Sequence, residues 1–181
     1  MKVLAICGSL RKLSTNMGLV RFAQQHAPAD LSIDIADLSD IPFYNADISE
    51  KPKALTNLLI ALEQADGLIL ACPEYNYSIA PALKNALDWA SREENNRLLN
   101  GKAVAIMGAG GGMGTSRAQY HLRQVCVFLN LHPLNKPEVF VNAYSGAFNS
   151  AGDVIDTKIQ GNIKTQLGAL KAWIQQLQNS N

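Results

Sequence analysis

The sequence predicts one α/β domain with a doubly wound parallel sheet, and three observations support this fold class. Short apolar runs alternate with amphipathic helical patterns, which requires right-handed crossovers onto a parallel sheet. The first, third and fourth of these runs are apolar throughout, as expected of central strands that helices cover on both faces. The length of 181 residues fits a single domain that spans residues 1–181.

Five strands are expected in this sheet. The predicted strands are residues 3–7, 31–35, 68–72, 103–107 and 139–141. In the second run, Leu31, Ile33 and Ile35 alternate with polar residues, so this strand is half-exposed and belongs at an edge. The expected strand order is therefore 2-1-3-4-5. In such sheets ligands bind beyond the carboxyl ends of the strands, where the loops after strands one and three meet.

Five helices are expected between and after these strands, on both faces of the sheet. Their apolar residues recur at helical spacing within residues 19–26, 55–62, 83–91, 122–129 and 163–177. Two connections are long, at 37–52 and at 142–158. Long loops in compact domains are often functional or form interfaces.

Composition and charge exclude several classes of function. The formal net charge of +1 predicts no broad surface for nucleic acid or for an anionic membrane, so any anion site must be local. The apolar stretch 3–7 is too short for a signal peptide or a membrane span, and we expect a cytoplasmic protein. No metal is expected, because the three cysteines and three histidines have no ligand spacing; they are Cys7, Cys72, Cys126, His26, His121 and His132.

The loop after the first strand is rich in hydrogen-bond donors. It reads G-S-L-R-K-L-S-T-N over residues 8–16 and passes from a buried strand directly into a helix. Hydroxyl groups, a guanidinium, an amide and the free N–H groups of a helix start together suit a phosphate dianion. With Gly8 as its only glycine, the loop fits neither a P-loop nor a dinucleotide fingerprint. We predict a phosphate cradle; a simple helix cap by Ser14 or Thr15 is the alternative.

The loop after the third strand carries a more specific motif. It reads P-E-Y-N-Y-S over residues 73–78 and is followed by L-K-N-A-L-D-W over residues 83–89. Together with the first loop, these motifs resemble the NADPH-dependent FMN reductase family of the flavodoxin-like superfamily, and within it the bacterial chromate and quinone reductases. The chain departs from the family at Ala80-Pro81-Ala82, where many relatives have Pro-Gly, and this departure affects the expected local turn.

The resemblance implies an enzyme that binds FMN and uses NADPH or NADH as co-substrate. Electrons would pass through FMN to a small-molecule acceptor such as a quinone, chromate, an azo compound or free flavin. The phosphate side of the implied cofactor site comprises Ser9, Leu10, Arg11, Ser14, Thr15, Asn16 and Met17. The flavin ring would be flanked by Pro73, Glu74, Tyr75 and Asn76.

A glycine-rich stretch follows the fourth strand, at residues 108–114. In both frames of a dinucleotide fingerprint the third glycine is missing, at Met113 or at Thr115. We therefore expect a flexible loop that closes over the flavin, with Ala109 and Gly110 as its contacts; a mobile linker is the alternative.

Four further residues are implied by the resemblance alone. In the family, the positions of Tyr77, Arg117, Tyr120 and Glu138 contribute to contacts between dimers and can close the substrate pocket. A homodimer or homotetramer is then expected, whereas ordinary solvated charges are the alternative for these residues.

No side chain is expected to act as an acid or a base, because the flavin carries the chemistry. Two other functions stay open, namely a flavodoxin-like electron carrier and a redox-sensing flavin-binding module. Such carriers usually present a strongly acidic face, which the near-neutral charge of this chain does not favour.

Overall fold

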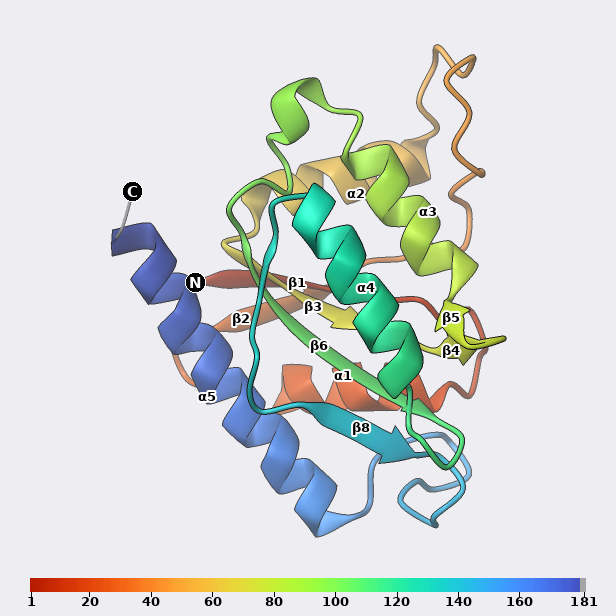
Figure 1. Ribbon diagram of the computed structural model, residues 1–181, viewed down its shortest axis with the longest axis vertical. Helices are drawn as coiled ribbons and strands as arrows, with labels where there is room; N and C mark the ends of the chain where they lie inside the picture. Colours follow the sequence, from red (N-terminus) through yellow and green to blue (C-terminus); the bar gives the residue numbers. More distant parts are fainter. Residues whose placement is uncertain (180–181) are drawn as a thin grey trace.

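A computed structural model, which describes residues 1–179, contains a central sheet with helices on both faces (Figure 1). Strands β1 (Lys2–Cys7), β3 (Gly67–Ala71) and β6 (Ala103–Gly110) form its centre, and β2 (Ser32–Ile35) lies at the edge beside β1. Every pairing in this sheet is parallel. The predicted fold class is therefore confirmed.

The other edge of the sheet differs from the prediction of five strands, because two short strands share it. Strand β7 (His132–Pro133) pairs with the start of β6, and β8 (Val139–Asn142) pairs with its end. In the described part of the chain, the sheet thus has six strands. Pro137 lies between the two short strands and has no N–H to donate to a ladder, which explains why one continuous strand does not form.

The helices form two layers. Helices α1 (Thr15–Gln25) and α5 (Thr157–Asn179) cover one face of the sheet. The other face is covered by α2 (Lys53–Gln64), α3 (Pro81–Ala90) and α4 (Ser116–Phe128), with the short 3₁₀ helix η1 (Glu94–Asn96) after α3. Across residues 1–179, none of these helices is both long enough and apolar enough to cross a membrane.

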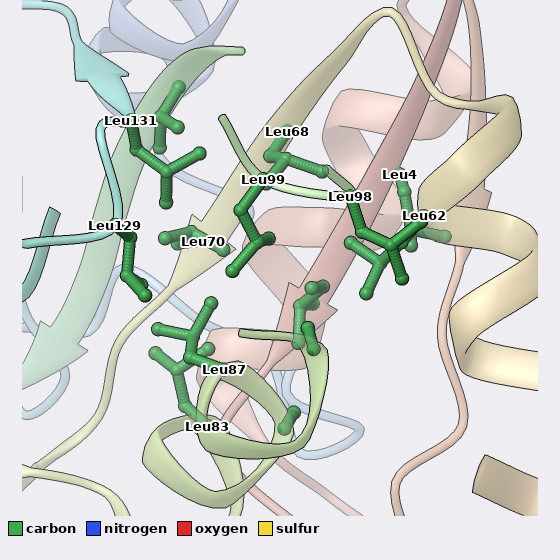
Figure 2. Packing of buried hydrophobic residues seen from close by; sticks show 14 of the residues in the cluster. Leu4, Leu62, Leu68, Leu70, Leu83, Leu87, Leu98, Leu99, Leu129 and Leu131 are labelled. Carbon is green, nitrogen blue, oxygen red and sulfur yellow. The ribbon is translucent and has the colours of Figure 1, made fainter. Parts of the chain in front are cut away.

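Leucine dominates the core between the sheet and α2, α3 and α4 (Figure 2). Leu68 and Leu70 point from β3 into this core, and Leu83 and Leu87 come from α3. Full burial of such a side chain contributes about 1.5–3 kcal/mol. The strands are therefore held firmly, and the loops at their carboxyl ends start from fixed points.

One predicted boundary near these loops is corrected. Strand β6 continues to Gly110, so Ala109 and Gly110 are strand residues that pair with Val141 and Asn142 instead of loop residues. Helix α4 begins at Ser116, and its first turns carry polar and charged side chains.

Candidate functional site

The loop over residues 8–16 leaves β1 at its carboxyl end and enters α1. The N–H of Gly8 donates to the carbonyl of Ala71 at 2.9 Å, which starts the turn on the sheet. A Cβ at Gly8 would stand 2.9 Å from Leu83 Cβ and 3.0 Å from Pro73 Cδ. Only glycine fits here without displacing α3 or the loop after β3.

The start of α1 presents unpaired donors. Ser14 is the N-cap, and its Oγ accepts a hydrogen bond from the N–H of Met17 at 3.2 Å. Within residues 1–179, the N–H groups of Thr15 and Asn16 donate to no protein acceptor. The first turn carries no acidic side chain, and within residues 1–179 the Arg11 guanidinium donates only to the carbonyl of Leu13, at 3.3 Å. A helix N-terminus with free N–H groups and a nearby guanidinium is suited to an anion.

Asn16 has a different environment from the one predicted. Its buried side chain bridges to the end of β6: Oδ1 accepts from the N–H of Ala109 at 2.9 Å, and Nδ2 donates to the carbonyl of Ala109 at 2.8 Å. The amide thus ties the start of α1 to the end of β6. Only the backbone N–H of Asn16 is left for an anion in the cradle.

The motif after β3 forms a small antiparallel hairpin of β4 (Glu74–Tyr75) and β5 (Ser78–Ile79). Its two central residues have positive φ, 49° at Asn76 and 68° at Tyr77, as in a two-residue turn of type I′. For a tyrosine this left-handed backbone costs about 1–3 kcal/mol. The surrounding contacts must therefore hold the turn.

Glu74 supplies the main contact. Its carboxylate, whose side chain is 7% exposed, accepts from Arg117 Nε at 2.6 Å and from the N–H of Ala118 at 3.3 Å. The guanidinium of Arg117 lies over the Tyr77 ring, with Cζ 3.6 Å from the ring centroid. Ser78 Oγ lies 3.1 Å from His121 Nδ1. These contacts clamp the hairpin onto the first turns of α4.

The four residues implied to lie at contacts between dimers do not form one cluster within the chain. Arg117 and Tyr77 contact each other, as described above. Tyr120 is exposed on α4, and Glu138 pairs with Lys136, with Nζ and Oε2 2.5 Å apart. Among the described residues, neither Tyr120 nor Glu138 forms a hydrogen bond or ion pair with the clamp.

The glycine-rich stretch is shorter and tighter than the predicted flexible loop. A Cβ at Gly108 would stand 2.6 Å from the carbonyl oxygen of Cys72, so only glycine fits beside β3. Gly111 and Gly114 form an isolated bridge, and Gly114 has a φ of 62°. The segment between β6 and α4 is therefore a compact turn.

Two supports of the site were missed by sequence reasoning. The segment after β8 packs against α1 so closely that a Cβ at Gly18 would stand 1.8 Å from the carbonyl oxygen of Gly152. Arg21 Nε donates to Asp153 Oδ1 at 2.8 Å in the same contact. The signal in the sequence was a glycine inside a predicted helix, which usually marks a close approach if it is not a break.

The second support holds the 37–52 connection against α3. Asn85 Oδ1 accepts from the N–H of Tyr44 at 2.7 Å, and Asn85 Nδ2 donates to the carbonyl of Pro42 at 2.9 Å. Trp89 Nε1 donates to the same carbonyl at 2.8 Å. The ring of Trp89 is buried in the core.

The chain is similar in sequence to known proteins. The model of the NADPH-dependent FMN reductase family matches residues 1–146. An NAD(P)H-dependent FMN reductase of Pseudomonas aeruginosa is 47% identical over 179 residues, which cover 97% of this chain and 96% of that protein. A probable NADPH:quinone oxidoreductase of Oryza sativa is 46% identical over 189 residues, with 99% and 95% covered.

Solved structures extend the comparison. FerB of Paracoccus denitrificans, a flavoenzyme NAD(P)H:(acceptor) oxidoreductase, superposes with a TM-score of 0.87 at 29% identity, and 97% of each chain is covered. A flavodoxin of Pseudomonas aeruginosa superposes with a TM-score of 0.66 at 15% identity, covering 94% of this chain and 99% of that one. The second likeness concerns the fold alone.

Proposed function

This chain belongs to the NADPH-dependent FMN reductase family, and we propose that the loop over residues 8–16 binds the phosphate of FMN. The protein is an NAD(P)H-dependent flavin oxidoreductase with FMN as its cofactor. One observation carries the placement of the phosphate: the free N–H groups of Thr15 and Asn16 stand at a helix N-terminus beside Arg11. Ser9, Leu10, Ser14 and Met17 complete the cradle, with Ser14 acting as its helix cap.

The flavin ring is assigned to the space between the hairpin and the end of β6. Pro73, Glu74, Tyr75 and Asn76 are proposed to contact one side of the ring, and Ala109 and Gly110 the other. Bound FMN supplies the electron-transfer chemistry. Because Glu74 is paired with Arg117, its negative charge does not oppose the charge that a reduced flavin carries. The protein's own task is to bind and orient, and no acid or base is assigned.

Quinones are the acceptors that we propose. The relatives named above support this class, since the rice protein carries a quinone oxidoreductase name. Chromate, azo compounds and free flavin are further candidates that an acceptor screen would rank. A cytoplasmic location and a single domain over residues 1–181 complete the proposal.

We also propose a homodimer or homotetramer that buries the exposed side of α4. Tyr120, Val127 and Phe128 are large apolar side chains that stand in solvent on this helix. Soluble monomers rarely expose such groups together, and cyclic dimers are the commonest assembly. Tyr77, Arg117 and Glu138 are proposed to border this contact. Sedimentation of the FMN-loaded protein as a monomer at micromolar concentration would count against it.

The phosphate assignment is tested by Arg11→Ala. A hydrogen bond to a charged group contributes about 1.5–3 kcal/mol, so FMN affinity should fall about ten- to a hundredfold. The adjacent Lys12→Ala change serves as the matched control, because it also removes one positive charge from the exposed loop. Titration by flavin fluorescence measures both. Equal losses in the two variants would contradict a specific role for the Arg11 fork.

The activity is tested with the reconstituted wild type. Anaerobic NADPH or NADH should bleach the bound flavin, and a quinone should then restore its colour. If neither nicotinamide bleaches the flavin, the reductase assignment fails, and an electron carrier that is reduced by a protein becomes the better function.

A further inference from the structure

A cavity of about 590 Å³ adjoins the cradle on the side of α3. Leu10 and Arg11 of the cradle and Tyr75 of the hairpin line it, so it touches both segments that are assigned to the cofactor. Its remaining walls are mostly apolar and include Leu38, Ile41, Phe43 and Pro81. This volume lies within the range of sites that hold small organic ligands, about 300–1,000 Å³.

The outer wall of this cavity is held in place by hydrogen bonds to α3. Phe43 is 77% exposed, although the residues on both sides of it are fixed to α3. Pro42 accepts hydrogen bonds from Asn85 and Trp89, and the N–H of Tyr44 donates to Asn85. The Tyr44 and Trp89 rings also meet edge to face, with centroids 5.0 Å apart. The fold therefore presents a bare phenyl ring to solvent from an anchored backbone.

The charged residues that line this cavity limit the class of ligand that it can bind. Of the described residues that line the cavity, Arg11 alone carries a formal charge, and it is already assigned to the phosphate. No second cation is left there for the pyrophosphate of a nicotinamide dinucleotide. A larger cavity of about 660 Å³, at the start of α2, is lined by three carboxylates and one cation and touches neither cofactor segment; its charged residues are Asp34, Asp37, Asp40 and Lys53. The cavity beside the cradle thus suits a neutral ring, and the aromatic side chains of Phe43 and Tyr75 favour an aromatic or quinonoid one.

We propose that this cavity is the subsite for the apolar ring of a quinone acceptor, with Phe43 as its specificity-determining wall. The proposal rests on the proposed function, since it concerns the second substrate of the same enzyme. Asn85 and Trp89 are positioning residues, because their side chains bond the segment that carries Phe43.

The decisive experiment measures binding without turnover. Oxidised, FMN-loaded protein is titrated calorimetrically with 2-methyl-1,4-naphthoquinone in the absence of NAD(P)H. Loss of the phenyl ring in Phe43→Ala should raise the quinone Kd about five- to tenfold. Tyr144→Ala is the matched control, because Tyr144 is an aromatic residue that is 85% exposed and lies outside the cavity. Its Kd should equal that of the wild type.

Two further measurements separate the outcomes. In turnover, Phe43→Ala should raise the KM for the naphthoquinone while leaving kcat and the rate with ferricyanide unchanged. An unchanged quinone Kd overturns the proposal. A parallel loss of FMN affinity overturns it as well by assigning the cavity to the cofactor, and a change in sedimentation alone assigns Phe43 to a subunit contact. Absence of NAD(P)H oxidation by the wild type would refute the proposed function instead, because the calorimetric result does not depend on turnover.

Discussion

The cradle and the hairpin lie side by side at the carboxyl ends of β1 and β3, but they treat their polar groups in opposite ways. Among residues 1–179, the N–H groups of Thr15 and Asn16 in the cradle have no acceptor. The hairpin pairs its buried carboxylate, Glu74, with Arg117 and with the backbone of α4. One region therefore keeps donors for a ligand, whereas the other uses its polar groups to hold a strained turn. Affinity should come mainly from the first region, and shape from the second.

The largest effect on stability is expected where the segment after β8 packs against α1, the helix that follows the cradle. Gly18→Ala would place a methyl group 1.8 Å from the carbonyl oxygen of Gly152, so α1 or the later segment must move. Overpacking of this kind costs about 1–3 kcal/mol or more. The control is Gly168→Ala in α5, where a Cβ meets nothing within 4 Å and where the change should stabilise by about 0.5–1 kcal/mol. Urea unfolding measures both signs, and a stabilised Gly18→Ala would contradict the packing.

An intermediate effect on stability is expected at the contacts that hold the hairpin against α4. Arg117→Ala leaves the buried Glu74 carboxylate without its cation, and we expect a loss in the free energy of unfolding. Glu74→Gln in the same chain should recover part of this loss, because it removes the unpaired charge. A double-mutant cycle in urea measures the coupling. Additive losses would mean that the pair does not hold the hairpin.

The smallest effect concerns the two thiols beneath these regions. Burial raises the pKa of the Cys72 thiol to about 12 and also raises the pKa of Cys7. Both thiols are thus protonated in the folded state at pH 8, and iodoacetamide should label neither before unfolding. The stability that burial of the neutral thiols contributes is complete below about pH 8.5 and declines as the pH rises toward 12. Rapid native labelling of Cys7 alone would show that the cradle opens and the hairpin does not.

Much of the fold could be predicted because apolar runs and helical periodicity are local signals. The hairpin could not be predicted, since its strands have two residues each and tyrosine is uncommon at the left-handed position of a turn, where Tyr77 lies. The residues proposed for the cradle could be named from the sequence, because donors beside a helix start are adjacent in the chain. The side-chain role of Asn16 could not be predicted, because its partner Ala109 is 93 residues away.

The bridge from Asn16 to Ala109 has a consequence for how this protein can change over time. It fixes the spacing between the first loop and the end of β6 directly, without passing through the chain that connects them. The segment around η1 lies within that intervening chain. Insertions or deletions in this segment can therefore accumulate among descendants, and new surface loops can be grafted there. The first loop and the end of β6 keep their separation in both cases.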